Sequence, residues 1–131
     1  MIVDSSALIA IAADESEAPA FAKAIESAGR TSVSAATLLE ASIVADRAGN
    51  PNTSRLFDEI FREGKISIEP FTAEQARIAR EAYRDFGKGS GHPAGLNFGD
   101  CIAYALAKDR GEPLLYKGTD FSHTDVRRAL D

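Results

Sequence analysis

Short apolar runs alternate with longer segments of helical periodicity along the whole chain. Four runs predict strands, at residues 1–3, 31–33, 66–68 and 114–116. Between them, apolar residues recur three and four positions apart, which predicts amphipathic helices. Short strands that alternate with helices indicate an α/β fold with a short central parallel sheet flanked by helices on both faces.

Capping residues and glycines predict where the helices begin and end. Asp4 suits a helix N-cap directly after the first strand. The spacing of Asp14 with Glu17, and of Thr72 with Gln75, predicts helix starts near residues 15 and 73. Further helices are expected over residues 35–48, from 51 to a stop at Gly64, up to Phe86, and from a cap at Asn97 to 109, with a loop at 87–95.

Length and composition predict one compact domain over residues 1–131. No apolar stretch is long enough to cross a bilayer and no basic segment precedes the first one, so we expect no membrane contact and a cytoplasmic location. Cys101 is the only cysteine, which excludes a disulfide within the chain and suits a reducing compartment.

The formal net charge of -5 argues against non-specific binding to a polyanion. The positions of the basic residues matter more than their sum. Arg77, Arg80 and Arg84 recur at helical spacing and are followed by Lys88, which is the pattern of a candidate RNA-binding stripe. The same pattern also fits a helix face that is merely solvated.

Four acidic residues differ from those on solvated helix faces, and each has an alternative explanation. Asp4 follows an apolar strand, where it also suits a plain N-cap. Glu40 lies in a helix that is apolar nearly all round, which predicts a buried helix, although an arginine partner or a rim position would also accommodate it. Asp100 lies in the first turn of a helix, where the dipole favours it, and Asp120 suits a turn after the last strand.

The joint arrangement of these acids predicts more than any one of them does. Ligand sites in parallel sheets form at the carboxyl ends of the strands, and three of the four acids lie after a strand or at a helix start. Carboxylates gathered there repel one another unless a hard cation, Mg²⁺ or Mn²⁺, is present. Zinc is disfavoured because no histidine or cysteine cluster exists. Such a site suits phosphodiester hydrolysis.

The chain resembles the PIN-domain ribonucleases, specifically the VapC toxins of toxin–antitoxin pairs, over essentially its whole length. The similarity lies in four segments in the same order and spacing. These are residues 2–8 (IVDSSAL), 37–41 (TLLEA), 96–101 (LNFGDC) and 118–121 (GTDF).

The resemblance implies roles for particular residues. Asp4, Glu40 and Asp100 are its core catalytic acids, with Asp4 and Asp100 as the principal Mg²⁺ ligands. Asp120 is the more variable fourth acid, because many relatives carry Thr or Ser immediately after the last strand, where this chain has Tyr116, Lys117 and Gly118. Ser6 and Asn97 occupy supporting positions, and each also fits a helix cap.

The resemblance further implies a homodimer, an antitoxin that plugs the active site, and an RNA substrate such as transfer or ribosomal RNA. Two other functions stay open. A Mg²⁺-dependent phosphatase uses a strand-end Asp as nucleophile, but such enzymes generally carry a second Asp two residues later, where this chain has Ser6. A catalytically silent PIN-like protein-binding module would not require all four acids.

Overall fold

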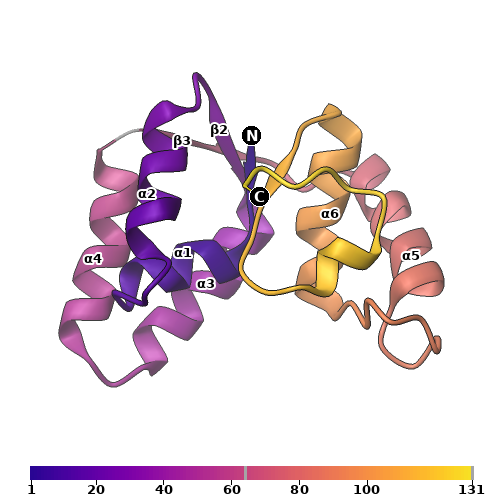
Figure 1. Cartoon of the computed structure of the whole chain (residues 1–131), viewed down its shortest axis with the longest axis horizontal. Helices are drawn as coiled ribbons and strands as arrows, with labels where there is room; N and C mark the ends of the chain where they lie inside the picture. The colour runs from indigo at the N-terminus through magenta and orange to yellow at the C-terminus, as the bar shows by residue number, and fades with distance from the viewer. Residues whose placement is uncertain (64, 131) are drawn as a thin grey trace.

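The computed structural model describes residues 1–63 and 65–130. Within these residues, short strands alternate with single helices or helix pairs, as the hydrophobic pattern predicts, giving four strands and six helices, and a short 3₁₀ helix, η1, follows the last strand (Figure 1). The order is β1 (Ile2–Val3), α1 (Ser5–Ala12), α2 (Ala18–Ser27), β2 (Thr31–Ser34), α3 (Ala35–Arg47), α4 (Pro51–Arg62), β3 (Ile66–Glu69), α5 (Ala73–Phe86), α6 (Phe98–Arg110), β4 (Leu114–Leu115) and η1 (Asp120–His123). The predicted helix end at Gly64 lies outside the described residues.

The strands form one parallel sheet in the order β3-β2-β1-β4. Ile2 pairs with Ser32 on one side and with Leu114 on the other, so β1 occupies the interior of the sheet. Because all four strands run the same way, their carboxyl ends meet at one edge. Asp4 and the segment that carries Asp120 leave the sheet at that edge.

Helices cover both faces of the sheet, which confirms the predicted α/β architecture. Side chains from α1, α2, α3 and α4 pack with Val3, Val33 and Leu115 in one core. Ile2 and Leu114 face the opposite side, where they pack with α5 and α6 in a second core. Figure 1 shows α1–α4 and α5–α6 on opposite sides of the strands. Among the described residues, no helix is long and apolar enough to cross a membrane.

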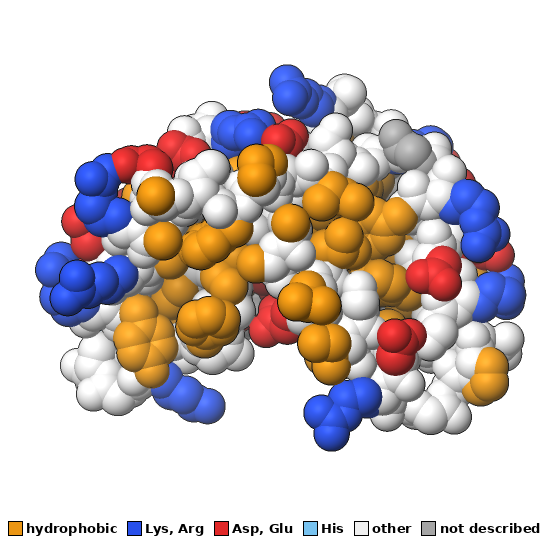
Figure 2. Space-filling view, turned by 180° about the vertical axis from the view of Figure 1, so that it is seen from behind, with side chains coloured by type: hydrophobic (Ala, Val, Ile, Leu, Met, Phe, Trp, Pro, Cys, Tyr) orange, Lys and Arg blue, Asp and Glu red, His pale blue; other side chains and the backbone are white. Residues whose placement is uncertain are grey.

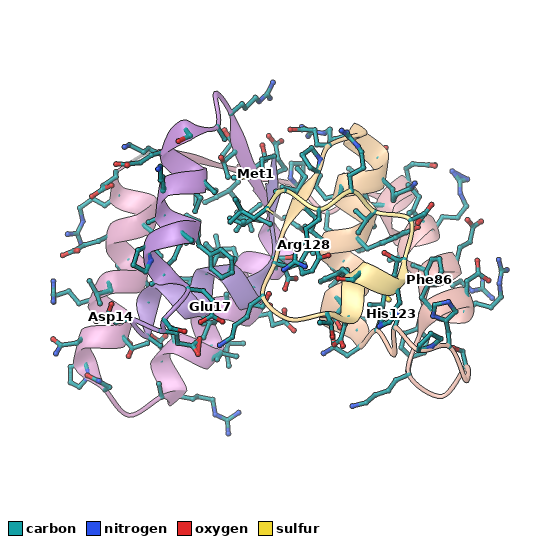
Figure 3. All side chains as sticks on the ribbon, in the orientation of Figure 1. Met1, Asp14, Glu17, Phe86, His123 and Arg128 are labelled. Atoms are coloured by element: carbon teal, nitrogen blue, oxygen red, sulfur yellow. The ribbon has the colours of Figure 1, made fainter. Side chains whose placement is uncertain are left out.

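The predicted helix start near residue 15 is wrong by about one turn. Asp14 adopts a left-handed backbone with φ of 53°, so it belongs to a turn and cannot cap a helix. The second helix begins at Ala18 instead, with a proline in its first turn and no side-chain cap from Glu17. Both residues lie in the α1–α2 turn (Figure 3). The start near 73 is confirmed, since Thr72 accepts a hydrogen bond from Gln75 N.

The prediction that the helix carrying Glu40 is buried is also wrong. Helix α3 buries only Thr37, Ala41 and Ala45, and the helix as a whole contacts α1, α4 and α6. On the other side, Leu39 is 62% exposed. Ile43 and Val44 are 47% and 48% exposed. The all-round apolar pattern therefore marks a helix with one packed face and one apolar face open to solvent.

Candidate active site

The four predicted acids come from four different elements at the carboxyl edge of the sheet. Asp4 is the N-cap of α1, directly after β1, and Glu40 lies halfway along α3. Asp100 lies in the first turn of α6, and Asp120 is the first residue of η1. Their charges act on one another: Asp100 and Glu40 raise the pKa of Asp4, while Asp120 and Glu40 raise that of Asp100.

Asp4 is the most deeply buried of these acids, with 2% of its surface exposed. One carboxylate oxygen, Oδ2, accepts hydrogen bonds from Ser6 N at 3.1 Å and Ser6 Oγ at 2.6 Å. The other oxygen, Oδ1, is buried and has no partner among the described residues. Burial raises the pKa of Asp4 from 3.8 to about 7, because the hydrogen bonds from Ser6 only partly offset the loss of hydration.

Ser6 connects Asp4 to the segment after the last strand. Its hydroxyl donates to Asp4 Oδ2 at 2.6 Å and accepts from the backbone N–H of Lys117 at 3.0 Å. The Lys117 ammonium in turn pairs with Glu15 at 2.9 Å and with Glu17 at 3.3 Å. The chain leading to Asp120 is thereby tied to β1 and to the α1–α2 turn.

Asp100 takes part in a reciprocal helix cap. Asn97 Oδ1 accepts from Asp100 N at 2.8 Å, and Asp100 Oδ2 accepts from Asn97 N at 3.0 Å. This pair fixes the Asp100 carboxylate at the helix start and leaves its Oδ1 for a further partner. Burial raises the pKa of Asp100, the backbone of Asn97 and the charge of Lys88 lower it, and the neighbouring acids raise it further.

Glu40 is half-buried, and one of its carboxylate oxygens, Oε1, is buried without a hydrogen-bond partner in the described part of the chain. No arginine pairs with it there, contrary to one of the alternatives that the sequence allows. Its carboxylate lies instead against Gly99 on the first turn of α6. Asp120 differs from the other three because its side chain is exposed.

These residues fit a hard divalent cation. Two buried carboxylate oxygens, Asp4 Oδ1 and Glu40 Oε1, lack partners among the described residues, and an unpaired buried carboxylate is costly unless a cation meets it. Within residues 1–63 and 65–130, however, the structure does not bring any three acidic, histidine or cysteine side chains together closely enough to hold a metal ion. An open, oxygen-rich edge suits Mg²⁺, which keeps several waters, better than it suits zinc.

Three members of the predicted basic stripe lie on the exposed surface of α5, and the fourth, Lys88, does not lie on this helix. Arg77 pairs with Glu74, and Arg84 Nε lies 3.2 Å from Asp85, so neighbouring acids offset part of their charge. Arg80 is exposed as well. Lys88 lies beyond the helix end, and its charge lowers the pKa of Asp100, which connects it to the acidic edge.

An apolar surface adjoins the acidic edge. Phe98 is 80% exposed and Phe71 is 38% exposed, and they line one groove with the exposed side chains of α3. Glu40 and Gly99 also line this groove. Figure 2 shows apolar side chains spread across this side of the molecule, with acidic side chains near the indentation of its lower edge. We call this surface the α3–α6 face; it comprises Ala36, Leu39, Ile43, Val44, Phe71, Phe98 and Ile102.

Two contributors to this edge have no distinct signal in the sequence. Lys117 acts through its backbone N–H, which any residue except proline supplies. Gly99 acts through the absence of a side chain, and its packing against Glu40 joins segments about 60 residues apart. A residue pattern along one element does not reveal contacts of that range.

Comparison with known proteins places the chain in a family. The PIN-domain family model matches residues 1–127. Ribonuclease VapC28 of Mycobacterium tuberculosis is 59% identical over 131 residues, which cover 100% of this chain and 98% of that protein.

Solved structures show the same fold at low sequence identity. The crystal structure of Mycobacterium tuberculosis VapC20, described as a sarcin–ricin loop cleaving toxin, has a TM-score of 0.73 at 16% identity, over 95% of each chain. A chain of a toxin–antitoxin complex from Klebsiella pneumoniae has a TM-score of 0.67 at 18% identity, over 92% of this chain and 89% of that one. The chain therefore belongs to the PIN-domain family, among its VapC ribonucleases.

Proposed function

We propose that this protein is a Mg²⁺- or Mn²⁺-dependent endoribonuclease and the toxin of a toxin–antitoxin pair, with its active site at the edge formed by Asp4, Glu40, Asp100 and Asp120. The observation that carries the proposal is the pair of buried, unpartnered carboxylate oxygens on Asp4 and Glu40, beside a third acid whose position is fixed by a helix cap. The ribonuclease part of the proposal is supported by membership of the PIN-domain family.

The residues of the edge divide into ligands and supports. Asp4 Oδ1 and Asp100 Oδ1 are the oxygens left for a cation, because Ser6 and Asn97 occupy the other oxygen of each carboxylate. A bound divalent cation lowers the pKa of a water and stabilises the charge that develops on the phosphate. We infer that Glu40 would accept a proton from the attacking water and that Asp120 would complete the negative edge from the solvent side.

An RNA substrate such as transfer or ribosomal RNA is the proposed target. Lys88, whose charge lowers the pKa of Asp100, is proposed to contact a phosphate at the acidic edge, and Arg80 and Arg84 are proposed to extend the path along α5. The relative described as cleaving the sarcin–ricin loop makes a structured RNA loop a reasonable first substrate. Because RNA is the proposed substrate, the proposed compartment is the cytoplasm.

Two protein partners belong to the proposal. The first is a cognate antitoxin that occludes the acidic edge, in line with the toxin–antitoxin complex among the similar structures. The second is another copy of this chain, docked through the α3–α6 face, since a large exposed apolar patch is typical of an interaction surface. Ile43→Asp should then convert a dimer to a monomer in light scattering, and a wild-type monomer at micromolar concentration would contradict the dimer.

RNA cleavage tests the function. Purified protein is incubated with total cellular RNA in Mg²⁺, in Mn²⁺ and in chelator, and new RNA ends are mapped. We expect a few discrete cleavage sites with metal, none in chelator, and none with Asp4→Asn or Asp100→Asn. Absence of cleavage by wild type on structured RNA would favour the silent binding module, whereas hydrolysis of a phosphate monoester without RNA cleavage would favour the phosphatase.

A further inference from the structure

Gly99 occupies the point where α3 and α6 meet at the acidic edge. It is buried in the first turn of α6, between the cap residue Asn97 and Asp100. A Cβ atom on Gly99 would lie 2.6 Å from both Cδ and Oε1 of Glu40, and closer still to Oε2. Real Cβ atoms essentially never approach another heavy atom within 3.0 Å. The Glu40 carboxylate therefore occupies the space that any other residue at position 99 would fill.

Helix propensity does not explain a glycine at this position. Glycine in a helix is less favourable than alanine, because it loses more backbone freedom on folding. The backbone of Gly99 is helical and needs no left-handed conformation, unlike Gly111 at the end of the same helix, with φ of 63°. The glycine lowers the stability of the helix relative to alanine, and the feature of the structure that requires it is the close approach of the Glu40 carboxylate.

This close approach holds the Glu40 carboxylate at a defined position in the site. Against the first turn of α6, the carboxylate lies at the positive end of the helix dipole and beside Asp100, the next residue along the chain. From there its charge acts on both Asp4 and Asp100. Displaced by a methyl group, the carboxylate at the end of this flexible side chain would have to leave that position.

We propose that Gly99 is a positioning residue of the proposed metal site: its missing side chain admits the Glu40 carboxylate to the first turn of α6 and thereby sets where this acid lies at the carboxyl edge of the sheet. This inference rests on the proposed function for its consequence, metal binding, but its structural half is independent of any activity. The two halves can therefore be tested separately.

A double-mutant cycle in metal-free protein tests the structural half. Melting temperatures are measured in chelator, at one protomer concentration, for wild type, Gly99→Ala, Glu40→Ala and the double variant. We expect Gly99→Ala to raise the melting temperature by about 3 °C once Glu40 is truncated, because the helix then gains an alanine without a clash, and to raise it by less or lower it in the wild-type background, where the Glu40 carboxylate must move.

Gly29→Ala is the matched control, since a Cβ there meets nothing within 4 Å. The change in melting temperature that Gly29→Ala causes should be the same with and without Glu40→Ala. Equal shifts for Gly99→Ala in the two backgrounds would overturn the proposal. If Gly99→Ala does not fold, recovery of folding in the double variant supports the same contact, and failure of both to fold overturns it.

Mn²⁺ binding measured by calorimetry tests the functional half. Folded Gly99→Ala should bind Mn²⁺ at least about tenfold more weakly than wild type, as expected when a residue that orients a ligand is changed. Gly29→Ala should bind like wild type. Wild-type affinity in Gly99→Ala would overturn the positioning role, whereas a wild type that binds no Mn²⁺ would overturn the proposed function and leave the result of the cycle intact.

Discussion

Asp4→Asn should stabilise the metal-free protein at neutral and alkaline pH, although it removes a proposed ligand. Asp4 is 2% exposed, and burial raises its pKa from 3.8 to about 7. A carboxyl group whose folded pKa is raised favours folding below its unfolded pKa, and that contribution is lost as the pH rises through the folded value. Asparagine has nearly the same shape and carries no charge at any of these pH values.

The expected difference in the free energy of unfolding follows from the pKa shift of Asp4. A shift of about three pH units, at about 1.4 kcal/mol each, corresponds to about 4 kcal/mol once the pH exceeds 8. Below pH 4 the carboxyl is protonated in both states, and the two proteins should differ little. Asp100 adds to the fall in wild-type stability, since burial raises its pKa as well; because its charge also acts on Asp4, this contribution should be smaller in Asp4→Asn and adds to the difference.

Urea unfolding in chelator, from pH 4 to pH 8.5, measures this difference directly. The free energy of unfolding of Asp4→Asn minus that of wild type should rise with pH and level off above pH 8. Mn²⁺ should reverse the order at pH 7.5, because it stabilises only a folded state that can bind it. An Asp4→Asn protein less stable than wild type by a constant amount at every pH would refute the reasoning and make Asp4 a plain helix cap.

Three further predictions concern the surroundings of the site. Ser6→Ala should lower stability by about 1–2 kcal/mol and move the pH dependence attributed to Asp4 to higher pH, since it removes the hydrogen bond to Asp4 Oδ2; urea unfolding across pH checks both effects. Phe57→Ala should cost about 3–5 kcal/mol of unfolding free energy in urea, because Phe57 is 4% exposed and stacks on Phe61. Cys101 is buried and its pKa is raised to about 11, so a thiol reagent at pH 8 should label it only after urea unfolds the protein; labelling of the native protein at a free-thiol rate would contradict its burial.

Local signals predicted the elements well where local physics decides them. Thr72 and Asn97 cap helices as predicted, because a cap depends on residues within one turn. Asp14 and Glu17 have the same spacing but do not form a capping box, because Asp14 adopts a left-handed backbone and the proline in the first turn of α2 favours a later start. Spacing alone does not distinguish these cases.

The site was predictable only as a set of acids at one edge. Parallel strands bring their carboxyl ends together, so the placement of Asp4 and Asp120 follows from the alternation of strands and helices. The apolar residues around Glu40 predicted a buried helix, but one face of this helix is open to solvent, as the exposure of Leu39 shows. A periodic pattern cannot tell an apolar face that packs within the chain from one left open to solvent. The contact with Gly99 depends on how α3 crosses α6, which no local pattern encodes.

The most direct test of the central claim is anomalous diffraction at the manganese edge from crystals soaked in Mn²⁺. If the unpartnered oxygens of Asp4 and Glu40 belong to a cation site, an anomalous peak should appear at the carboxyl edge of the sheet, within about 2.0–2.4 Å of Asp4 and Asp100 oxygens. The peak should be absent from Asp100→Asn crystals treated in the same way. No peak at this edge in wild type, with manganese bound elsewhere, would contradict the assignment of these carboxylates as a metal-dependent nuclease site.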